Sequence, residues 1–441
     1  MGETSARALL AELSPDFEPL AAPERSTEPD GPLRWAGYDE QRERARERTG
    51  EDESVLCGLG RIGGEQVVLV AFEFGFMGGS LGRDSGQRVV AAFERARELR
   101  VPVVSLVASG GSRLQEGVVA LSQLQAIARA CLLARRERIP HLSVARHPTT
   151  GGMWASLVAG ADVVLGLTGA DVAFGGSRVR GGGDTGEPFT AEGKAEHGQV
   201  DRLVDERELP EELGLLVRLL HPRRRVAPPR AAEVPEPLGD RQPPRSGWDA
   251  VQRARSEQRP RAAEYLDAHF DVRVELSGDR AGGVDPGMLC GIGERSGHTA
   301  VFAAQTGTAN TPAGFRTAAR VLRLADQLAL PALTLVDTPG ADNGAESERA
   351  GLGPALAELF GTVADVRVPV TTLVIGEGGS GGALALAAPE RTWITPDAYF
   401  AVLAPESAAA VLRRDDLADL TESLRLRPQD LQELGLLRQA P

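Results

Sequence analysis

The sequence has a single lysine, Lys194, so its positive charge comes almost entirely from arginine. A phosphate-binding loop of the GxxxxGK[ST] type needs a lysine beside the glycine-rich turn to reach the phosphates. Lys194 stands in EGKAEHG, far from the glycine-rich segment GEGGSGGA at 376–383. The sequence therefore excludes a nucleotide site of this type.

Cysteine and histidine are also scarce. The three cysteines, Cys57, Cys131 and Cys290, are far apart and form no CxxC pair, so the sequence contains neither a zinc ribbon nor a disulfide framework. We expect them to be buried thiols. The histidines of residues 51–220 lack the HExxH motif and other metal-ligand spacings, and we expect no metal site.

Long hydrophobic runs are missing as well. Crossing a bilayer takes about 18 or more apolar residues, and the best run, 67–77, contains Glu73. The first residues, MGETSARALLAEL, lack the basic region and cleavage site of a secretory signal. The net charge is −13 and the arginines are scattered, which argues against a nucleic-acid surface. We expect a cytoplasmic protein with no membrane or nucleic-acid partner.

The sequence repeats itself at a constant interval. PVVSLVASGGSRLQEG begins at Pro102, and PALTLVDTPGADNGAE begins at Pro331. Further on, Pro140 and Pro369 each open another apolar segment that ends in glycines. Pro331 follows Pro102 at the same interval at which Pro369 follows Pro140, which indicates two related domains.

The segments between these landmarks predict the fold class. Residues 88–99 and 317–328 have apolar side chains at helical spacing, and 67–74 and 298–305 are apolar strands that precede them. Each half is predicted to run helix, strand, Gly-rich turn, helix, strand, Gly-rich turn, helix. Apolar strands that alternate with helices are typical of an α/β domain whose sheet is covered by helices.

Composition suggests the domain boundaries. Residues 221–247 are rich in proline, which prevents a regular helix and favours an extended linker. Residues 1–50 are polar and charge-rich, and we expect a polar N-terminal extension with one solvated helix and no chemistry. The two domains would then occupy residues 51–220 and 248–441.

Four glycine-rich turns follow apolar strands and precede helices, two in each half. Glycine permits positive φ and close approach of a ligand, and free amides at a helix start favour an anionic oxygen. The turns are therefore candidate oxyanion holes. They contain Ser109, Gly110 and Gly111; Gly151 and Gly152; Gly340; and Gly381, Gly382 and Ala383.

The alternatives to oxyanion holes are weaker. Tight strand-to-helix packing would explain any single glycine pair, but four turns at equivalent places favour a ligand. A dinucleotide site, which needs GxGxxG followed by an acidic residue about twenty positions later, ranks low. A serine nucleophile would need the motif GxSxG. Ser380 in GGSGG comes closest to it, but no candidate acid and base follow it persuasively. We expect backbone amides to act. Ser112, Glu116 and Glu377 would cap or line the turns, and Asp337 would cap DTPG.

With these motifs the sequence resembles the carboxyltransferase component of acetyl-CoA carboxylase and its propionyl-CoA relatives. The first half resembles the bacterial β subunit and the second half the α subunit, as in a fused β-α chain. The segments that carry the resemblance are FEFGFMGGSLG at 72–82, ASGGSRLQEG at 108–117, PTTGGMWAS at 148–156, WDAVQRAR at 248–255, VELSGDR at 274–280, DTPGA at 337–341, VIGEGGSGGALAL at 374–386 and APE at 404–406.

This resemblance implies two tandem crotonase-like domains, each a spiral of ββα units. It also implies a reaction that moves CO2 from N1-carboxybiotin to the α-carbon of an acyl-CoA. Gly110 and Gly111 would hold the thioester enolate, and Gly382 and Ala383 the urea oxygen of biotin. Further substrate contacts are implied for Ser109, Gly151, Gly152, Gly340, Gly381 and Ala385.

The resemblance also implies partners. Lys194 does not have the Met-Lys-Met setting in which biotin is attached, so biotin would arrive on a separate carrier. Biotin carboxylase and the biotin carboxyl carrier protein would be the protein partners, and acetyl-CoA or propionyl-CoA the substrate. The homo-oligomer would be a dimer of trimers in which the two holes face each other across a subunit interface.

Some segments depart from the family pattern. The first half has no four-cysteine zinc ribbon, and TGTANTP at 306–312 replaces a basic segment. Ser277 and Asp342-Asn343 stand where His and Tyr-Pro are commoner. These departures leave two alternatives open: a decarboxylase subunit of a membrane sodium pump, and a catalytically degenerate scaffold paralogue. Ala385 matches a position linked to acyl-chain choice, and its small side chain modestly favours acetyl-CoA.

Overall fold

The computed structural model describes residues 4–23, 28–176, 186–224 and 228–440. The chain divides into two compact units, Met1–Arg224 (unit 1) and Arg225–Pro441 (unit 2). This division differs from the predicted boundaries, because residues 1–50 fall within unit 1 and most of the proline-rich segment falls within unit 2.

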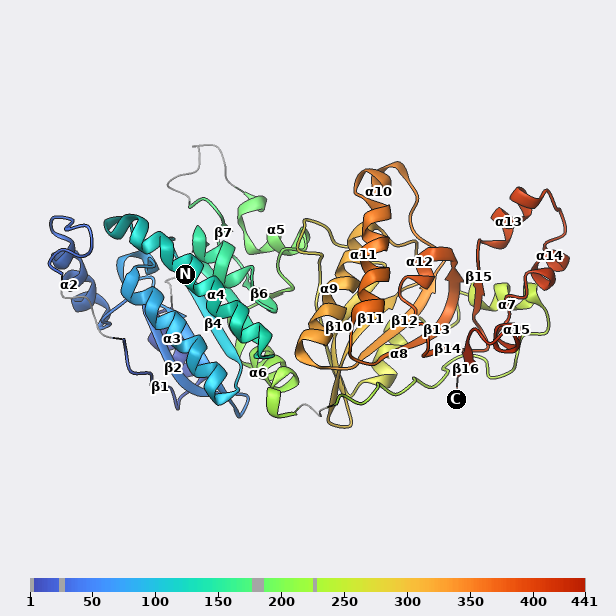
Figure 1. Cartoon of the computed structure of the whole chain (residues 1–441), viewed down its shortest axis with the longest axis horizontal. Coiled ribbons are helices and arrows are strands. Elements are labelled where there is room, and N and C mark those ends of the chain that lie inside the picture. Colours follow the sequence, from blue (N-terminus) through green and yellow to red (C-terminus); the bar gives the residue numbers. More distant parts are fainter. Residues whose placement is uncertain (1–3, 24–27, 177–185, 225–227, 441) are drawn as a thin grey trace. The chain divides into compact units, whose positions relative to one another are not determined.

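Unit 1 is built on one eight-stranded sheet with the order β1-β2-β3-β4-β5-β6-β8, and β7 pairs with β5. β2 and β3 form an antiparallel hairpin, and the pairing is parallel from β3 onward. α3 (Arg83–Leu99) packs against β2 and β3 and beside α4 (Gly117–Arg136), as Figure 1 shows. The strands are β1 (Glu18–Pro19), β2 (Val55–Ile62), β3 (Glu65–Phe72), β4 (Val103–Ser109), β5 (His141–Thr150), β6 (Val163–Leu167), β7 (Val172–Ala173) and β8 (Arg202–Val204).

Unit 2 repeats this plan with the strand order β16-β14-β13-β12-β11-β10-β9, and β15 pairs with β13. α9 (Pro312–Leu328) packs against β10 and β11 and beside α11 (Leu352–Asp365), whereas α8 (Ala262–His269) buries Tyr265 and Leu266 against the sheet. The strands are β9 (Val272–Glu275), β10 (Met288–Arg295), β11 (His298–Gln305), β12 (Ala332–Thr338), β13 (Val370–Gly379), β14 (Thr392–Ile394), β15 (Tyr399–Ala401) and β16 (Arg438–Gln439).

The predicted repeat is confirmed element by element. The bounds of β4 and β12, of β5 and β13, and of α3 and α9 are all separated by the interval of the sequence repeat. The parallel register also shifts at equivalent places, between Val107 and Ser109 in unit 1 and between Val336 and Thr338 in unit 2. Both sheets therefore bend at the point where the first Gly-rich turn begins.

The N-terminal segment is packed onto unit 1. α1 (Ala6–Leu13) buries Leu9 and Leu10, and the Ala6 amide donates to the Glu73 carboxylate at 2.8 Å. β1 pairs with β2. The predicted solvated helix is α2 (Tyr38–Thr49), most of which is exposed, but Tyr38 at its start is fully buried. The segment is thus an integral part of unit 1 rather than an extension.

The proline-rich segment forms no helix or strand over residues 228–246, as predicted. It is nevertheless docked on unit 2. Ala232 and Val234 pack against the core beside α8, and the Leu238 amide donates to the Tyr265 hydroxyl at 3.1 Å. This part of the segment is therefore packed against unit 2 and is not a free linker.

One helical stretch of the described residues, Leu114–Arg136, is long and apolar enough to cross a membrane by length and composition. This is weak support for a membrane segment, because helices of water-soluble proteins pass the same test. The stretch comprises a 3-10 turn (Leu114–Glu116) and α4, which packs beside α3 and leaves Leu114 and Val118 exposed. The absence of a membrane partner remains a prediction.

The predicted thiol burial is confirmed for Cys57 and Cys290, and Cys131 is partly buried. Burial raises the pKa of all three thiols to about 12, so they stay protonated at neutral pH. A protonated thiol is a poor nucleophile. The three cysteines are thus packing residues.

Candidate active site

The first turn of unit 1 follows the bulge at the end of β4. Gly111 has φ of +107°, a conformation that glycine adopts without strain. Its amide donates to the Ser109 hydroxyl at 3.1 Å, whereas the Gly110 amide donates to the Gly78 carbonyl at 2.8 Å. A hydroxyl can rotate and release its donor, but a backbone carbonyl is fixed. Of the two amides expected to hold the enolate, that of Gly110 thus has a backbone acceptor, whereas that of Gly111 is held only by a side-chain hydroxyl.

The second turn of unit 1 adjoins the first. Gly151 has φ of +66°, and a methyl group at its Cα would lie 3.2 Å from the Gly111 Cα. The Gly151 amide donates to the Phe174 carbonyl at 2.9 Å, but no hydrogen bond of the described residues uses the Gly152 amide. Gly152 opens a short helical stretch, where amides have no intrahelical acceptor. The two turns thus meet at Gly111 and Gly151, next to the Gly152 amide, for which the described residues provide no acceptor.

Unit 2 repeats the first turn. The Gly340 amide donates to the Thr338 hydroxyl at 3.1 Å, and Gly340 has φ of +140°. Thr338 and Gly340 are the repeat equivalents of Ser109 and Gly111, so the same hydroxyl-to-amide contact occurs in both units. Pro339 occupies the position of Gly110 and has no amide hydrogen.

The second turn of unit 2 leads into α12 (Ser380–Leu384). A methyl group on Gly382 would lie 2.5 Å from the Ala341 nitrogen, so α12 sits directly on the first turn. Within the described residues, the amides of Gly382 and Ala383 donate to no acceptor outside α12, and a methyl group on Gly381 would meet no atom within 4 Å. The side chains of Ala383 and Ala385 are both fully buried.

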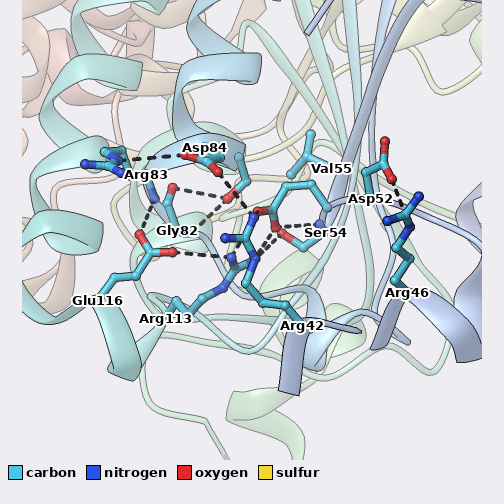
Figure 2. Close-up of polar contacts among 12 residues, drawn as sticks. Arg42, Arg46, Asp52, Ser54, Val55, Gly82, Arg83, Asp84, Arg113 and Glu116 are labelled. Carbon is cyan, nitrogen blue, oxygen red and sulfur yellow. Dashed lines mark hydrogen bonds and ion pairs between the residues drawn. The ribbon is translucent and has the colours of Figure 1, made fainter. Parts of the chain in front are cut away.

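A buried ion-pair network lies beside the turn of unit 1, and Figure 2 shows its members Arg113 and Glu116. Arg113 is 1% exposed; its Nη1 donates to Glu53 at 3.0 Å and to Tyr38 at 3.0 Å, and lies 3.4 Å from Glu116. Burial would raise the pKa of Glu53, but the charge of Arg113 lowers it to about 2. Glu116 thus belongs to this network rather than capping the turn, and also accepts the Arg83 amide at 2.6 Å.

Unit 2 has its own buried pair beside the turns. Arg259 donates to one oxygen of Asp337 at 2.6 Å and Arg261 to the other at 3.2 Å. The first of these oxygens also accepts the Glu377 amide at 3.1 Å, which links the ends of β12 and β13. Asp337 therefore ties two strands to the preceding arginines, a role different from the predicted cap of DTPG.

The Glu377 side chain makes polar contacts on unit 2. It accepts from Arg255 at 2.9 Å and from the Tyr399 hydroxyl at 2.7 Å, and Arg255 reaches Glu406 at 2.6 Å. Burial raises the pKa of Tyr399 above its ordinary value, so the phenol stays protonated. Glu377 is thus held in place by Arg255 and Tyr399, five residues before Gly382 in the chain. This agrees with a role in lining the turn rather than in acid-base catalysis.

Comparisons with known proteins cover both units. The family described as "Carboxyl transferase domain" matches residues 32–203, and that described as "Acetyl co-enzyme A carboxylase carboxyltransferase-like" matches residues 245–440. A relative from Salinispora arenicola, an acetyl-coenzyme A carboxylase carboxyl transferase subunits beta/alpha chain, is 37% identical over 98% of this chain and 81% of its own length. The chain belongs to the biotin-dependent acyl-CoA carboxyltransferases.

Other relatives and structures agree with this. The carboxyltransferase is 33% identical to a probable biotin-dependent acyl-coenzyme A carboxylase beta3 subunit of Mycobacterium bovis, over 96% of this chain and 84% of the relative. A structure of transcarboxylase 12S, with methylmalonyl-coenzyme A and methylmalonic acid bound, superimposes with a TM-score of 0.80 at 22% identity, covering 99% of this chain and 86% of that one. At this identity the likeness shows the fold, two tandem crotonase-like domains, as predicted.

The carboxyltransferase fold brings together most of the residues expected from the sequence. Gly111 and Gly151 meet in unit 1, and Gly340 and Gly382 meet in unit 2. The sequence pattern does not predict the roles of Tyr38, Glu53, Arg259 or Arg261. Arg113 had one available signal, since it lies within the SRLQEG segment three residues before Glu116. Its other partners are 60 and 75 residues away, where no local pattern reveals them.

Proposed function

We propose that this carboxyltransferase moves CO2 from carboxybiotin, held on a separate carrier protein, to the α-carbon of acetyl-CoA, with propionyl-CoA as the second candidate substrate. The observation that supports this most directly is the amide of Gly382, a buried residue in the first turn of α12 whose amide has no acceptor outside that helix among the described residues. Such an amide favours an oxygen that carries developing negative charge.

The biotin side fits unit 2. The amides of Gly382 and Ala383 would hold the urea oxygen, and the open space beside Gly381 leaves room for its approach. Carboxybiotin would supply the CO2, and the biotin urea anion left after its release would take the α-proton. Asp337 and Glu377 would keep the two turns of unit 2 in register, because both are anchored by arginines.

The acyl side fits unit 1. The amides of Gly111 and Gly152 would hold the enolate oxygen of the thioester, with the Ser109 hydroxyl releasing the Gly111 amide as the acyl group enters. Gly110 would shape the turn, since its own amide is held by Gly78. Two aligned reactants and two stabilised oxyanions need no side-chain acid or base, which matches the lack of such groups in the turns.

The relatives support the substrate and the assembly. Relatives named as acetyl-coenzyme A carboxylase carboxyl transferases favour acetyl-CoA, and transcarboxylase 12S is a hexamer assembly whose structure holds methylmalonyl-CoA. We propose a dimer of trimers in the cytoplasm that works with biotin carboxylase and a biotin carboxyl carrier protein. Sedimentation of the purified chain tests the assembly, and a monomer that is active would contradict it.

The reverse reaction tests the function. Purified chain mixed with malonyl-CoA and free biotin or biotinylated carrier should release acetyl-CoA, and methylmalonyl-CoA should react more slowly. Faster turnover of methylmalonyl-CoA would make propionyl-CoA, rather than acetyl-CoA, the preferred substrate. No turnover of either compound, with carrier present and the oligomer intact, would reject the transferase and favour a scaffold.

A further inference from the structure

A short segment, 78–82, holds the Gly111 turn through backbone hydrogen bonds. The Leu81 amide donates to the Gly111 carbonyl at 2.9 Å, and the Arg113 amide donates to the Leu81 carbonyl at 2.8 Å. The Gly78 carbonyl accepts the Gly110 amide on the other side of the turn. The direction of the Gly111 peptide therefore depends on where this segment lies.

The Arg113 side chain fixes the middle of the same segment. Its Nη2 donates to the Ser80 carbonyl at 2.8 Å, and its Nε donates to the Ser80 hydroxyl at 3.2 Å. The guanidinium is a rigid fork, so its orientation passes directly to the groups that it binds. Arg113 thus contacts segment 78–82 twice, through its backbone amide at Leu81 and through its side chain at Ser80.

The guanidinium is held by Glu53 on one side, and Tyr38 adds a further contact. The Tyr38 hydroxyl accepts from Arg113 at 3.0 Å and donates to the Glu116 carboxylate, so a neutral group bridges the two charges. Tyr38 is the first residue of α2 and has no exposed surface. Through this hydroxyl, the N-terminal segment contacts Arg113 and Glu116, which follow the Gly111 turn in the chain.

We propose that Tyr38 and Arg113 are positioning residues for the Gly111 amide, so that α2 is a working part of the acyl-CoA site. The inference rests on the proposed role of Gly111 in binding the enolate. Without the Tyr38 hydroxyl, Arg113 loses one acceptor and Glu116 loses one donor. Both can then shift toward each other, and Ser80 and segment 78–82 move with the guanidinium.

Tyr38→Phe tests this with a minimal change, because it removes one oxygen and keeps the buried ring. Tyr265→Phe is a matched control: Tyr265 is also buried, but its hydroxyl accepts the Leu238 amide in unit 2 and, within the described residues, has no hydrogen bond with Arg113 or segment 78–82. We expect Tyr38→Phe to lower kcat with malonyl-CoA about tenfold and to change KM for free biotin less than about twofold, whereas Tyr265→Phe keeps kcat.

Amide hydrogen exchange provides a readout independent of activity. In Tyr38→Phe, exchange should quicken in peptides that cover 78–82 and 109–113, while peptides of α9 in unit 2 keep the wild-type rate. Unchanged exchange in the turn would overturn the inference, as would faster exchange with unchanged kcat. An inactive wild-type chain would instead reject the proposed function, and exchange would still show whether Tyr38 holds the turn.

Discussion

Arg259 Nη2 lies 2.6 Å from Asp337 Oδ1, and both side chains are almost completely buried, with 3% and 0% of their surface exposed. The same carboxylate oxygen accepts the Glu377 amide, so one buried charge pair joins the strands that carry both turns of unit 2. Unit 1 also has a buried pair beside its first turn, formed by Arg113 and Glu53, but the two pairs stand at different positions of the repeat.

Replacing Asp337 by Asn should destabilise unit 2 by about 3–5 kcal/mol, because Arg259 is left buried without its counter-charge. Denaturant unfolding of the variant and the wild type measures the difference. Asp326→Asn is the control, since Asp326 pairs with the largely exposed Arg367 and should have a far smaller effect. Equal losses in the two variants would contradict the importance of the buried pair.

Gly111→Ala and Gly110→Ala should differ in activity. Gly111 has positive φ and a recruitable amide, so a methyl group there displaces a donor and should lower kcat about 10²-fold or more. A methyl group on Gly110 would meet only the Gly78 carbonyl at 3.3 Å, and we expect a loss below about tenfold. Steady-state kinetics with malonyl-CoA and free biotin measures both, and the opposite ranking would restore Gly110 as the donor.

Gly381→Ala should separate folding from catalysis on the biotin side. No atom lies within 4 Å of the added methyl group, so the thermal midpoint should stay near that of the wild type. The methyl group would occupy the space proposed for the urea oxygen, and KM for free biotin should rise or kcat fall by about tenfold. Gly361→Ala in α11 is the control, because its methyl group is also unhindered and lies away from the turns. Full activity of Gly381→Ala would remove Gly381 from the site.

His141 should make the stability of unit 1 sensitive to acid. Its Nε2 lies 2.9 Å from the Ser105 hydroxyl, and burial lowers its pKa to about 3. Since an unfolded histidine has a pKa of about 6.5, the unfolded chain binds the proton more readily. The stabilisation is complete above about pH 6.5 and is lost toward pH 3, at up to about 1.4 kcal/mol per pH unit.

His141→Gln should lower the number of protons taken up on unfolding by about one, and with it the slope of the unfolding free energy against pH, because glutamine does not titrate. Urea unfolding between pH 5 and pH 7.5 measures the slope for unit 1. His269 gives unit 2 a separate contribution of the same sign, since burial lowers its pKa to about 4. An identical slope in wild type and variant would show that His141 is not neutral in the folded chain.

The sequence by itself determined the repeat, the α/β class and the positions of the four turns. These follow from local signals: apolar runs at strand and helix spacing, and glycines where Gly111 and Gly340 need positive φ. The constant interval between the two repeats also required no structure, because equivalent strands keep equal spacing in both units.

Only the tertiary structure decided which amides of the first turn have a backbone acceptor. Gly110 and Gly111 look alike in the sequence, but Gly78, from an earlier segment, takes the amide of Gly110 alone. The partners of Arg113 and Asp337 also come from distant segments, and the N-terminal segment docks through Tyr38 and α1. Hydrogen bonds of this kind depend on which strands and helices lie side by side in the fold. Local sequence patterns do not predict such long-range contacts.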